Sequence, residues 1–229
     1  MSLTPMFWFD SGPGDSAFNM ALDEALLRSA SRLNRPVLRF YSWTEPAASF
    51  GYSQKYAAVE RMTPLRPLVR RPTGGGLVPH AADWTYALAF PAGDSWYELR
   101  AAESYRRVHT WVQAAFARLG VEVALAPASH KTRAGQCFAG HEAADVLWQG
   151  RKIAGAAQRR TRDGLLIQGS VQPPPLGLAR ADWQQAMRDT ARLERAVHWT
   201  EFRPEAALQA QALALAAQKY SQAAYNRKR

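Results

Sequence analysis

The chain has 229 residues, 47% of them hydrophobic and 21% charged, which is ordinary for a globular protein and sufficient for one core. It has no apolar run of about 18 residues, which excludes a membrane-spanning helix. Its single cysteine excludes an internal disulfide, disfavours a structural zinc site and fits a reducing compartment. A net charge of +10 predicts an acidic partner, but the basic residues are scattered and form no nucleic-acid-binding module. We therefore expect one cytoplasmic domain over residues 1–229, with no nucleic acid and no membrane as partner.

The first half of the chain shows one helical pattern followed by several strand patterns. Phe18, Leu22 and Leu26 recur every four positions, which predicts an amphipathic helix over residues 15–33. Large and small side chains alternate from Trp84 to Phe90, as in a strand with one buried face. Shorter strands are predicted over residues 37–43, 47–52 and 68–71.

The middle of the chain predicts a helix, a long loop and two hairpins. Helical spacing of apolar residues covers 98–119, and a strand pattern follows at 121–125. Residues 127–144 have no period, and a loop of that length in a compact domain is more often functional than not. Hairpins are expected over residues 145–155 and at the Asp163-Gly164 pair, because Asp-Gly favours a tight turn.

The C-terminal region, residues 181–229, is expected to be helical. Helical patterns fit residues 181–196 and 204–225. Hairpins in the middle of the chain argue against an all-parallel sheet. The predicted fold class is α/β (α+β), with a mixed β-sheet flanked by helices.

The most distinctive stretch is residues 70–80, which contains three consecutive glycines, Gly74 to Gly76. Glycines cost backbone entropy in regular structure, but they let a ligand approach the backbone closely. Arg71 and His80 place a charge and a titratable group beside that opening. The stretch lacks the pattern of a Walker loop or a dinucleotide fold. The alternative interpretation is a glycine-rich hairpin turn with surface arginines.

Lys152 is a candidate for carbonyl or phosphate chemistry. It lies among small residues at 154–157, which leave space beside it, and a lysine ammonium can polarise a carbonyl or neutralise a phosphate. The alternative is a strand lysine that faces solvent.

Cys137 is a candidate nucleophile. It lies in a glycine-flanked loop, and Lys131, Arg133 and His141 are near it in sequence, which would favour the thiolate. The alternative is a small buried hydrophobic residue, which is the usual environment of a lone cysteine.

Together, these segments resemble the catalytic domain shared by lipoate–protein ligases, octanoyl/lipoyl transferases and, more distantly, biotin–protein ligases. The matching segments occur in the same order along most of the chain: NMALDEALL (19–27), GYSQ (51–54), RRPTGGGLVPH (70–80) with DWTY (83–86), GRKIAGAAQRR (150–160) and LIQGS (166–170). The resemblance implies a fold of the biotin/lipoate protein ligase catalytic type with a tunnel for an acyl chain.

The resemblance also implies roles for individual residues. Lys152 would contact the acyl carbonyl, or the adenylate phosphate in members that use ATP. Gly155 and Ala156 would wall the acyl chain. The substrate cavity would be lined by Arg71, Thr73, Gly74, Gly75, Gly76 and His80, with no metal ligand among them.

Two mechanisms occur in this family, and the sequence favours one of them. Ligases activate lipoate with ATP and Mg, and they usually carry a Gly-Arg-Asn-Asp-like segment that is absent here. Transferases need no cofactor and take octanoate from octanoyl acyl carrier protein through a cysteine thioester. The transferases most like this chain carry a Cys-Phe pair before the lysine strand, and here Cys137-Phe138 precedes Lys152. We therefore expect an octanoyltransferase with catalytic Cys137 and Lys152.

The acceptors would be lysines of lipoyl-domain proteins, such as the glycine cleavage H protein or a 2-oxoacid dehydrogenase E2. An ATP-dependent lipoate–protein ligase and a non-catalytic acyl- or nucleotide-binding paralogue remain alternatives. Two positions depart from the family pattern: Gln168 replaces a common histidine, and Ala81 replaces a common acidic residue. The sequence identifies no base for deprotonating the acceptor amine.

Overall fold

A computed structural model describes residues 3–131 and 135–228. Its centre is an eight-stranded sheet with strand order β13-β1-β2-β6-β12-β11-β10-β7. Strand β1 pairs in parallel with β2 and β13, and the other pairs are antiparallel, so the predicted mixed sheet is confirmed. The strands are β1 (Thr4–Gly14), β2 (Val37–Trp43), β6 (Trp84–Pro91), β7 (Ala124–Leu125), β10 (Val146–Trp148), β11 (Arg151–Thr161), β12 (Gly164–Val171) and β13 (Val197–Glu201).

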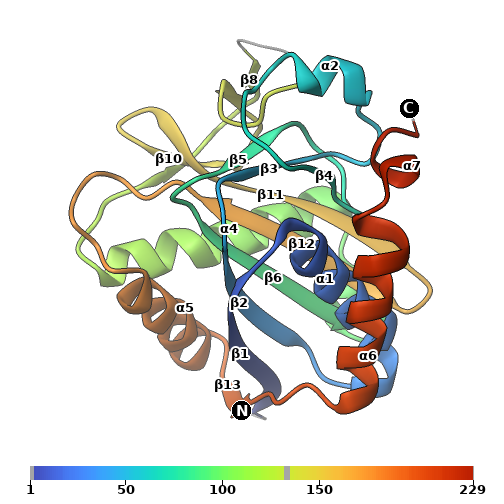
Figure 1. Ribbon diagram of the computed structural model, residues 1–229. Helices are drawn as coiled ribbons and strands as arrows, with labels where there is room; N and C mark the ends of the chain where they lie inside the picture. The colour runs from blue at the N-terminus through green and yellow to red at the C-terminus, as the bar shows by residue number, and fades with distance from the viewer. Residues whose placement is uncertain (1–2, 132–134, 229) are drawn as a thin grey trace.

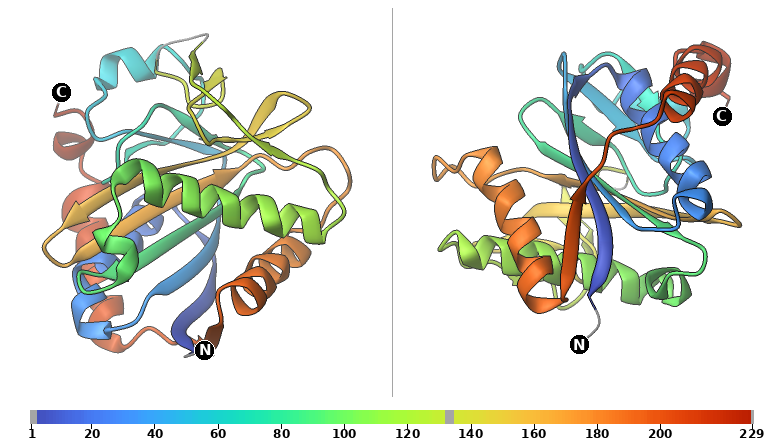
Figure 2. Two further views of the ribbon diagram at one scale, coloured as in Figure 1. Left: turned by 180° about the vertical axis from the view of Figure 1, so that it is seen from behind. Right: turned by 90° about the horizontal axis from the view of Figure 1, so that it is seen from below.

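Helices cover both faces of this sheet (Figures 1 and 2). Helices α4 (Ala101–Arg118) and α5 (Arg180–Glu194) lie on one face, where Trp111 and Trp183 are buried. Helices α1 (Ser16–Leu33) and α6 (Ala206–Leu215) lie on the other. None of the helices within the described ranges is long and apolar enough to cross a membrane.

A smaller sheet carries the triple glycine. It consists of β4 (Leu68–Arg70), β3 (Ala47–Phe50) and β5 (Val78–His80), in that order, and the glycines lie between β4 and β5. Gly75 has a φ of 85°, and a Cβ on Gly51 would lie 1.9 Å from the Gly75 carbonyl oxygen. Glycine at both positions therefore allows the turn at residues 51–54 to pack directly against the triple-glycine loop.

The long loop at 127–144 contains a short two-stranded pair rather than only irregular chain. Strands β8 (His130–Lys131) and β9 (Gly140–His141) are antiparallel. Arg133, which was expected near Cys137, lies outside the described residues. Two short helices, α2 (Tyr56–Glu60) and α3 (Ser95–Glu98), complete the part of the chain before α4.

Two strands differ from the sequence-based expectation. The sequence pattern does not predict β1, because Pro5, Gly12 and Pro13 resemble turn residues, and the strand contains an irregularity between Asp10 and Pro13. Strand β13 lies within the region 181–229 that was expected to be helical. Its partner is β1, almost the whole chain away, so no local pattern could reveal the pairing.

The C-terminal helical segment is clamped to α1 by a buried carboxylate. The segment expected as one helix is α6 followed by a π-helical turn (Ala216–Tyr220) and α7 (Ala223–Asn226). Glu24 accepts hydrogen bonds from Lys219 (2.6 Å), Tyr220 and Arg28. Burial acts to raise the pKa of Glu24, but these hydrogen bonds and positive charges outweigh it and hold the pKa below 4.5.

Candidate active site

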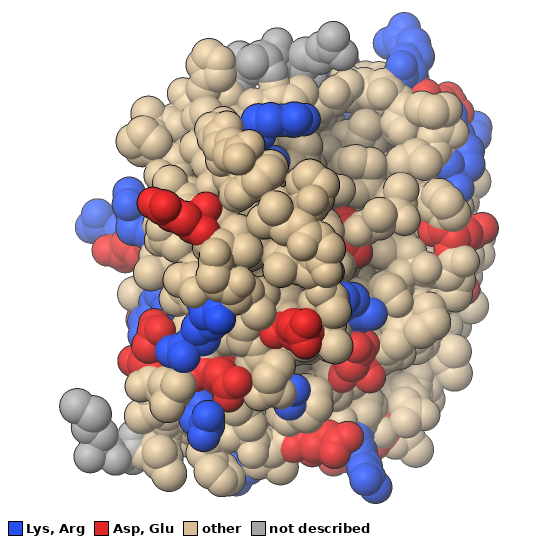
Figure 3. Space-filling model, turned by 90° about the vertical axis from the view of Figure 1, so that its left-hand side faces the viewer, with Lys and Arg blue, Asp and Glu red and all other residues tan. Residues whose placement is uncertain are grey.

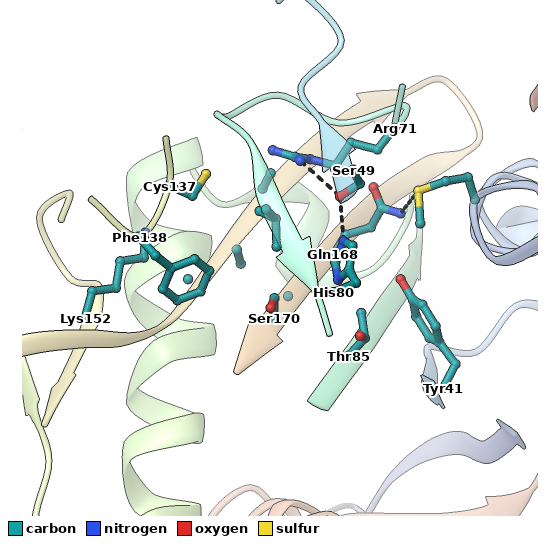
Figure 4. A pocket seen from close by; sticks show the side chains of 16 residues that line it. Tyr41, Ser49, Arg71, His80, Thr85, Cys137, Phe138, Lys152, Gln168 and Ser170 are labelled. Carbon is teal, nitrogen blue, oxygen red and sulfur yellow. Dashed lines mark hydrogen bonds between the residues drawn. The ribbon is translucent and has the colours of Figure 1, made fainter. Parts of the chain in front are cut away.

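One cavity lies between the triple-glycine loop, the loop before β10, and strands β11 and β12 (Figure 4). Cys137, Phe138 and Lys152 lie at one end, and Tyr41 and Gln168 at the other. The cavity is lined by Met20, Tyr41, Ser49, Arg71, Val78, His80, Thr85, Cys137, Phe138, Lys152, Gly155, Ala156, Ala157, Gln168, Gly169 and Ser170.

Most of the residues expected from the sequence meet at this cavity. Arg71, His80, Cys137, Lys152, Gly155 and Ala156 line it. Gly75 and Gly76 line an adjoining cavity that shares Cys137, Lys152 and Ala156 with the first. Thr73 and Gly74 are not in either lining. Among the described residues, no group of three or more His, Cys, Asp or Glu side chains is arranged to hold a metal ion.

Lys152 is fixed at the edge of the cavity by a buried carboxylate. Its Nζ lies 2.7 Å from Asp145 Oδ2, and the two side chains are 6% and 0% exposed. Tyr105 from α4 donates to Asp145 Oδ1, and the Glu142 backbone N–H donates to Oδ2 at 2.6 Å. A Cβ on Gly155 would lie 2.6 Å from Lys152 Nζ, so glycine there leaves space for the ammonium. The sequence pattern did not single out Asp145 or Tyr105.

The charges around Lys152 affect two neighbouring side chains. Burial, and then the negative charge of Asp145, raise the pKa of Tyr105 well above its usual value, so the phenol remains a hydrogen-bond donor. Burial, and then the positive charge of Lys152, lower the pKa of His109 to about 3, which keeps that imidazole neutral. The Lys152 Nζ also lies 5.3 Å from the centre of the Phe138 ring.

Cys137 faces a cation that the sequence neighbours did not predict. Its Sγ accepts a hydrogen bond from the Gly76 backbone N–H at 3.1 Å. A Cβ on Gly75 would lie 2.8 Å from Arg71 Nη2 and 3.7 Å from Cys137 Sγ, so the guanidinium and the sulfur flank the same glycine. Burial lowers the pKa of Arg71, and its interaction with Cys137 opposes that shift. The cation beside the sulfur is thus supplied by the glycine stretch.

A chain of three buried side chains extends from Arg71 into the wall of the cavity. Ser49 Oγ lies 2.8 Å from His80 Nε2, and His80 Nδ1 lies 2.8 Å from Asp83 Oδ2. The Trp43 ring stacks on His80 with 3.8 Å between ring centres. Ala81, which departs from the family pattern, is exposed, and Asp83 supplies the carboxylate that pairs with His80. Sequence reasoning singled out neither Ser49 nor Asp83.

Gln168, the second departure, occupies a place that suits an amide. Its Oε1 accepts from Thr73 Oγ1 at 2.7 Å, and its Nε2 donates to Asp23 Oδ2 at 2.7 Å. Asp23 is fully buried, pairs with Arg39 at 2.6 Å and accepts from Tyr41 at 3.0 Å. Thr73 therefore supports the cavity from behind its wall.

The sheet topology, with a glycine loop and a lysine strand facing one cavity, is the architecture of a lipoate–protein ligase catalytic domain. Two solved structures show the same fold at 18% identity: protein Ta0514 of T. acidophilum with bound lipoic acid (TM-score 0.80, 100% of both chains) and lipoate-protein ligase A bound with ATP (TM-score 0.78, 99% of both chains). The chain belongs to the family described as the lipoyl protein ligase A/B catalytic domain, whose sequence profile matches residues 15–172.

Within this family, the chain is similar in sequence to several curated octanoyltransferases. The chain is 34% identical over 177 residues to octanoyltransferase LipM of Halalkalibacterium halodurans, and 34% identical over 179 residues to octanoyltransferase LipM of Bacillus subtilis. Each match covers 72% of this chain and 64% of the relative, so it spans slightly less than two thirds of the relatives' length.

Proposed function

We propose that the protein is an octanoyltransferase that acylates a lysine of lipoyl-domain proteins, with all of residues 1–229 forming one catalytic domain. One observation supports this proposal above the others: the Cys137 thiol and the Lys152 ammonium line the same cavity, and the small residues Gly155, Ala156 and Ala157 form part of its wall. The similarity to LipM octanoyltransferases supports the same reaction.

The first half-reaction moves the octanoyl group onto the protein. The Cys137 thiolate attacks the carbonyl carbon of octanoyl acyl carrier protein and forms a new C–S bond, while the C–S bond to the donor breaks and the donor leaves as a thiolate that takes a proton from solvent. Negative charge develops on the carbonyl oxygen, where the fixed Lys152 ammonium stabilises it. Because Asp145 holds that ammonium at 2.7 Å, little reorganisation is needed at the moment of reaction.

The second half-reaction transfers the acyl group to the acceptor. The lysine amine of a lipoyl-domain protein, such as the glycine cleavage H protein or a 2-oxoacid dehydrogenase E2, attacks the thioester carbon. The N–C bond forms, the C–S bond to Cys137 breaks, and the amine releases a proton to solvent or to the thiolate. This route needs neither ATP nor Mg.

The net charge of +10 is consistent with acidic donor and acceptor proteins. On the face shown in Figure 3, however, basic and acidic side chains are interspersed and form no large patch of one sign. We therefore expect the charge to accelerate encounter in general rather than to define one docking surface on that face.

Intact mass spectrometry after incubation with octanoyl acyl carrier protein tests the proposal. We expect one octanoyl adduct on the wild-type protein, none on Cys137→Ala, and transfer of the adduct to a lipoyl-domain acceptor. An unmodified wild-type protein, under conditions where a known octanoyltransferase is acylated, would refute the cysteine route. Lipoate-dependent pyrophosphate exchange would then identify an ATP-dependent ligase, and binding without either reaction would identify a non-catalytic paralogue.

A further inference from the structure

Within residues 3–131 and 135–228, no histidine is hydrogen-bonded to the Cys137 sulfur. The hydrogen bond at its sulfur comes from the Gly76 backbone N–H. Two of the described histidines line the cavities that Cys137 also lines: His80, which bonds to Ser49 and Asp83, and His141, which makes no hydrogen bond to the sulfur. Since a cysteine nucleophile needs its thiolate form, another group must favour the negative charge. Arg71 is the cation that the structure places beside the sulfur.

In the series of hydrogen bonds from Arg71 to Asp83, the two end groups determine the direction of the bond that each of them makes. A guanidinium can only donate, and a carboxylate can only accept. Arg71 Nη1 therefore donates to Ser49 Oγ at 3.3 Å. At the other end, His80 Nδ1–H donates to Asp83 Oδ2, and in the neutral imidazole Nε2 then accepts a hydrogen bond from the Ser49 hydroxyl. One tautomer of His80 satisfies all three bonds.

Ser49 holds the part of Arg71 that the glycine loop does not. The Nε and Nη2 atoms donate to the Gly74 carbonyl at 3.0 and 2.6 Å, and Nη2 also donates to the Gly76 carbonyl at 2.7 Å. Nη1 instead donates to Ser49. These contacts restrain the plane of the guanidinium from two sides. Because Arg71 and Ser49 are 4% and 2% exposed, water offers no ready substitute.

We propose that Arg71 is the counter-ion that makes Cys137 nucleophilic, and that Asp83, His80 and Ser49 form a positioning relay that holds Arg71 against the sulfur. The inference rests on the proposed function in taking Cys137 as the nucleophile. Arg71 acts on the reacting sulfur directly, whereas the three relay residues act through Arg71. No proton passes along the relay, since the guanidinium stays protonated.

The single cysteine makes the proposal testable without an acyl donor, because alkylation by iodoacetamide reports on Cys137 alone. Because a neighbouring positive charge favours the thiolate that reacts, Arg71→Met should slow alkylation at neutral pH roughly tenfold. Its rate should recover at alkaline pH. Ser49→Ala should shift the pH profile in the same direction by a smaller amount. Trp43→Phe serves as the control: it keeps a ring over His80 and all three relay bonds, and it removes only the neighbouring hydrogen bond from Trp43 to Thr85.

Alkylation of Arg71→Met with the wild-type rate and pH profile would overturn the proposal. A wild-type profile for Ser49→Ala would overturn the relay. Ser49→Ala removes one oxygen atom, so it keeps the proposal falsifiable if Arg71→Met does not fold. The result is independent of acyl transfer: an Arg71-dependent thiol in a protein that octanoyl acyl carrier protein does not acylate would refute the proposed function and leave this inference standing.

Discussion

The Asp145–Lys152 pair offers the sharpest test of how the active-site ammonium is held. Asp145→Asn keeps the shape of the side chain and removes its charge. Lys152, with a side chain that is 6% exposed, would then carry a buried charge without a counter-ion. We expect this substitution to destabilise the fold and to weaken octanoyl transfer.

The expected magnitude follows from the burial of both partners. Breaking a buried ion pair by removing one charge costs about 3–5 kcal/mol, and the asparagine carbonyl can recover about 1 kcal/mol by accepting from the ammonium. A net loss of about 3 kcal/mol corresponds to a fall in Tm of roughly 6–12 °C for a domain of this size. In the Asp145→Asn background, Lys152→Met removes the stranded charge, so the double variant should be more stable than Asp145→Asn alone.

Urea unfolding of the wild type, both single variants and the double variant gives the coupling energy directly. A loss below about 1 kcal/mol for Asp145→Asn would be the value of an exposed ion pair. That result would refute the reasoning, because it would mean that water reaches Lys152 and that its position is not fixed by the protein.

Three further substitutions test other parts of the structure. Gly169→Ala would place a Cβ 2.1 Å from the Tyr86 ring, so it should lower Tm strongly in thermal unfolding, whereas Gly93→Ala, with no atom within 4 Å, should change it little. Glu24→Gln should reduce the free energy of unfolding at neutral pH. Because the folded-state pKa of Glu24 is lowered, this difference should start to shrink near pH 4.5 and vanish only as pH falls through the lower folded-state value, which urea unfolding at several pH values would measure. Ala156→Leu should obstruct the cavity and reduce the octanoyl adduct roughly tenfold in intact mass spectra. Because Ala156 also packs against the main core, a fall in Tm should accompany this loss.

The sequence was sufficient to identify the elements that carry the site. The alternation of large and small residues from Trp84 to Phe90 predicted β6, although that strand is buried on both faces. Four-residue spacing around Leu22 predicted α1. The order of the glycine loop, Cys137 and Lys152 predicted that they belong to one site, and the structure places all three around adjoining cavities.

The residues that hold the site could not be predicted in the same way. Asp145 and Asp83 are buried carboxylates, and burial of a charged residue leaves no period in the sequence. Each depends on partners from distant strands or helices: Asp145 on Tyr105, and Asp83 on Ser170. Similarly, sequence proximity pointed to Lys131, Arg133 and His141 near Cys137, and it could not indicate Arg71, which the fold brings close from 66 positions earlier.

The polar lining of the cavity is compatible with an apolar acyl chain because its hydrogen-bonding groups are already paired. Two buried carboxylates behind the cavity wall accept hydrogen bonds from five of the polar lining residues. Asp23 accepts from Tyr41 and Gln168. Asp83 accepts from His80, Thr85 and Ser170. A free buried donor costs about 1–3 kcal/mol, so an unpaired lining would hold water in preference to hydrocarbon. The acids behind the wall therefore keep the cavity suitable for an acyl chain, which explains why α1, far from Cys137 in sequence, forms part of the site.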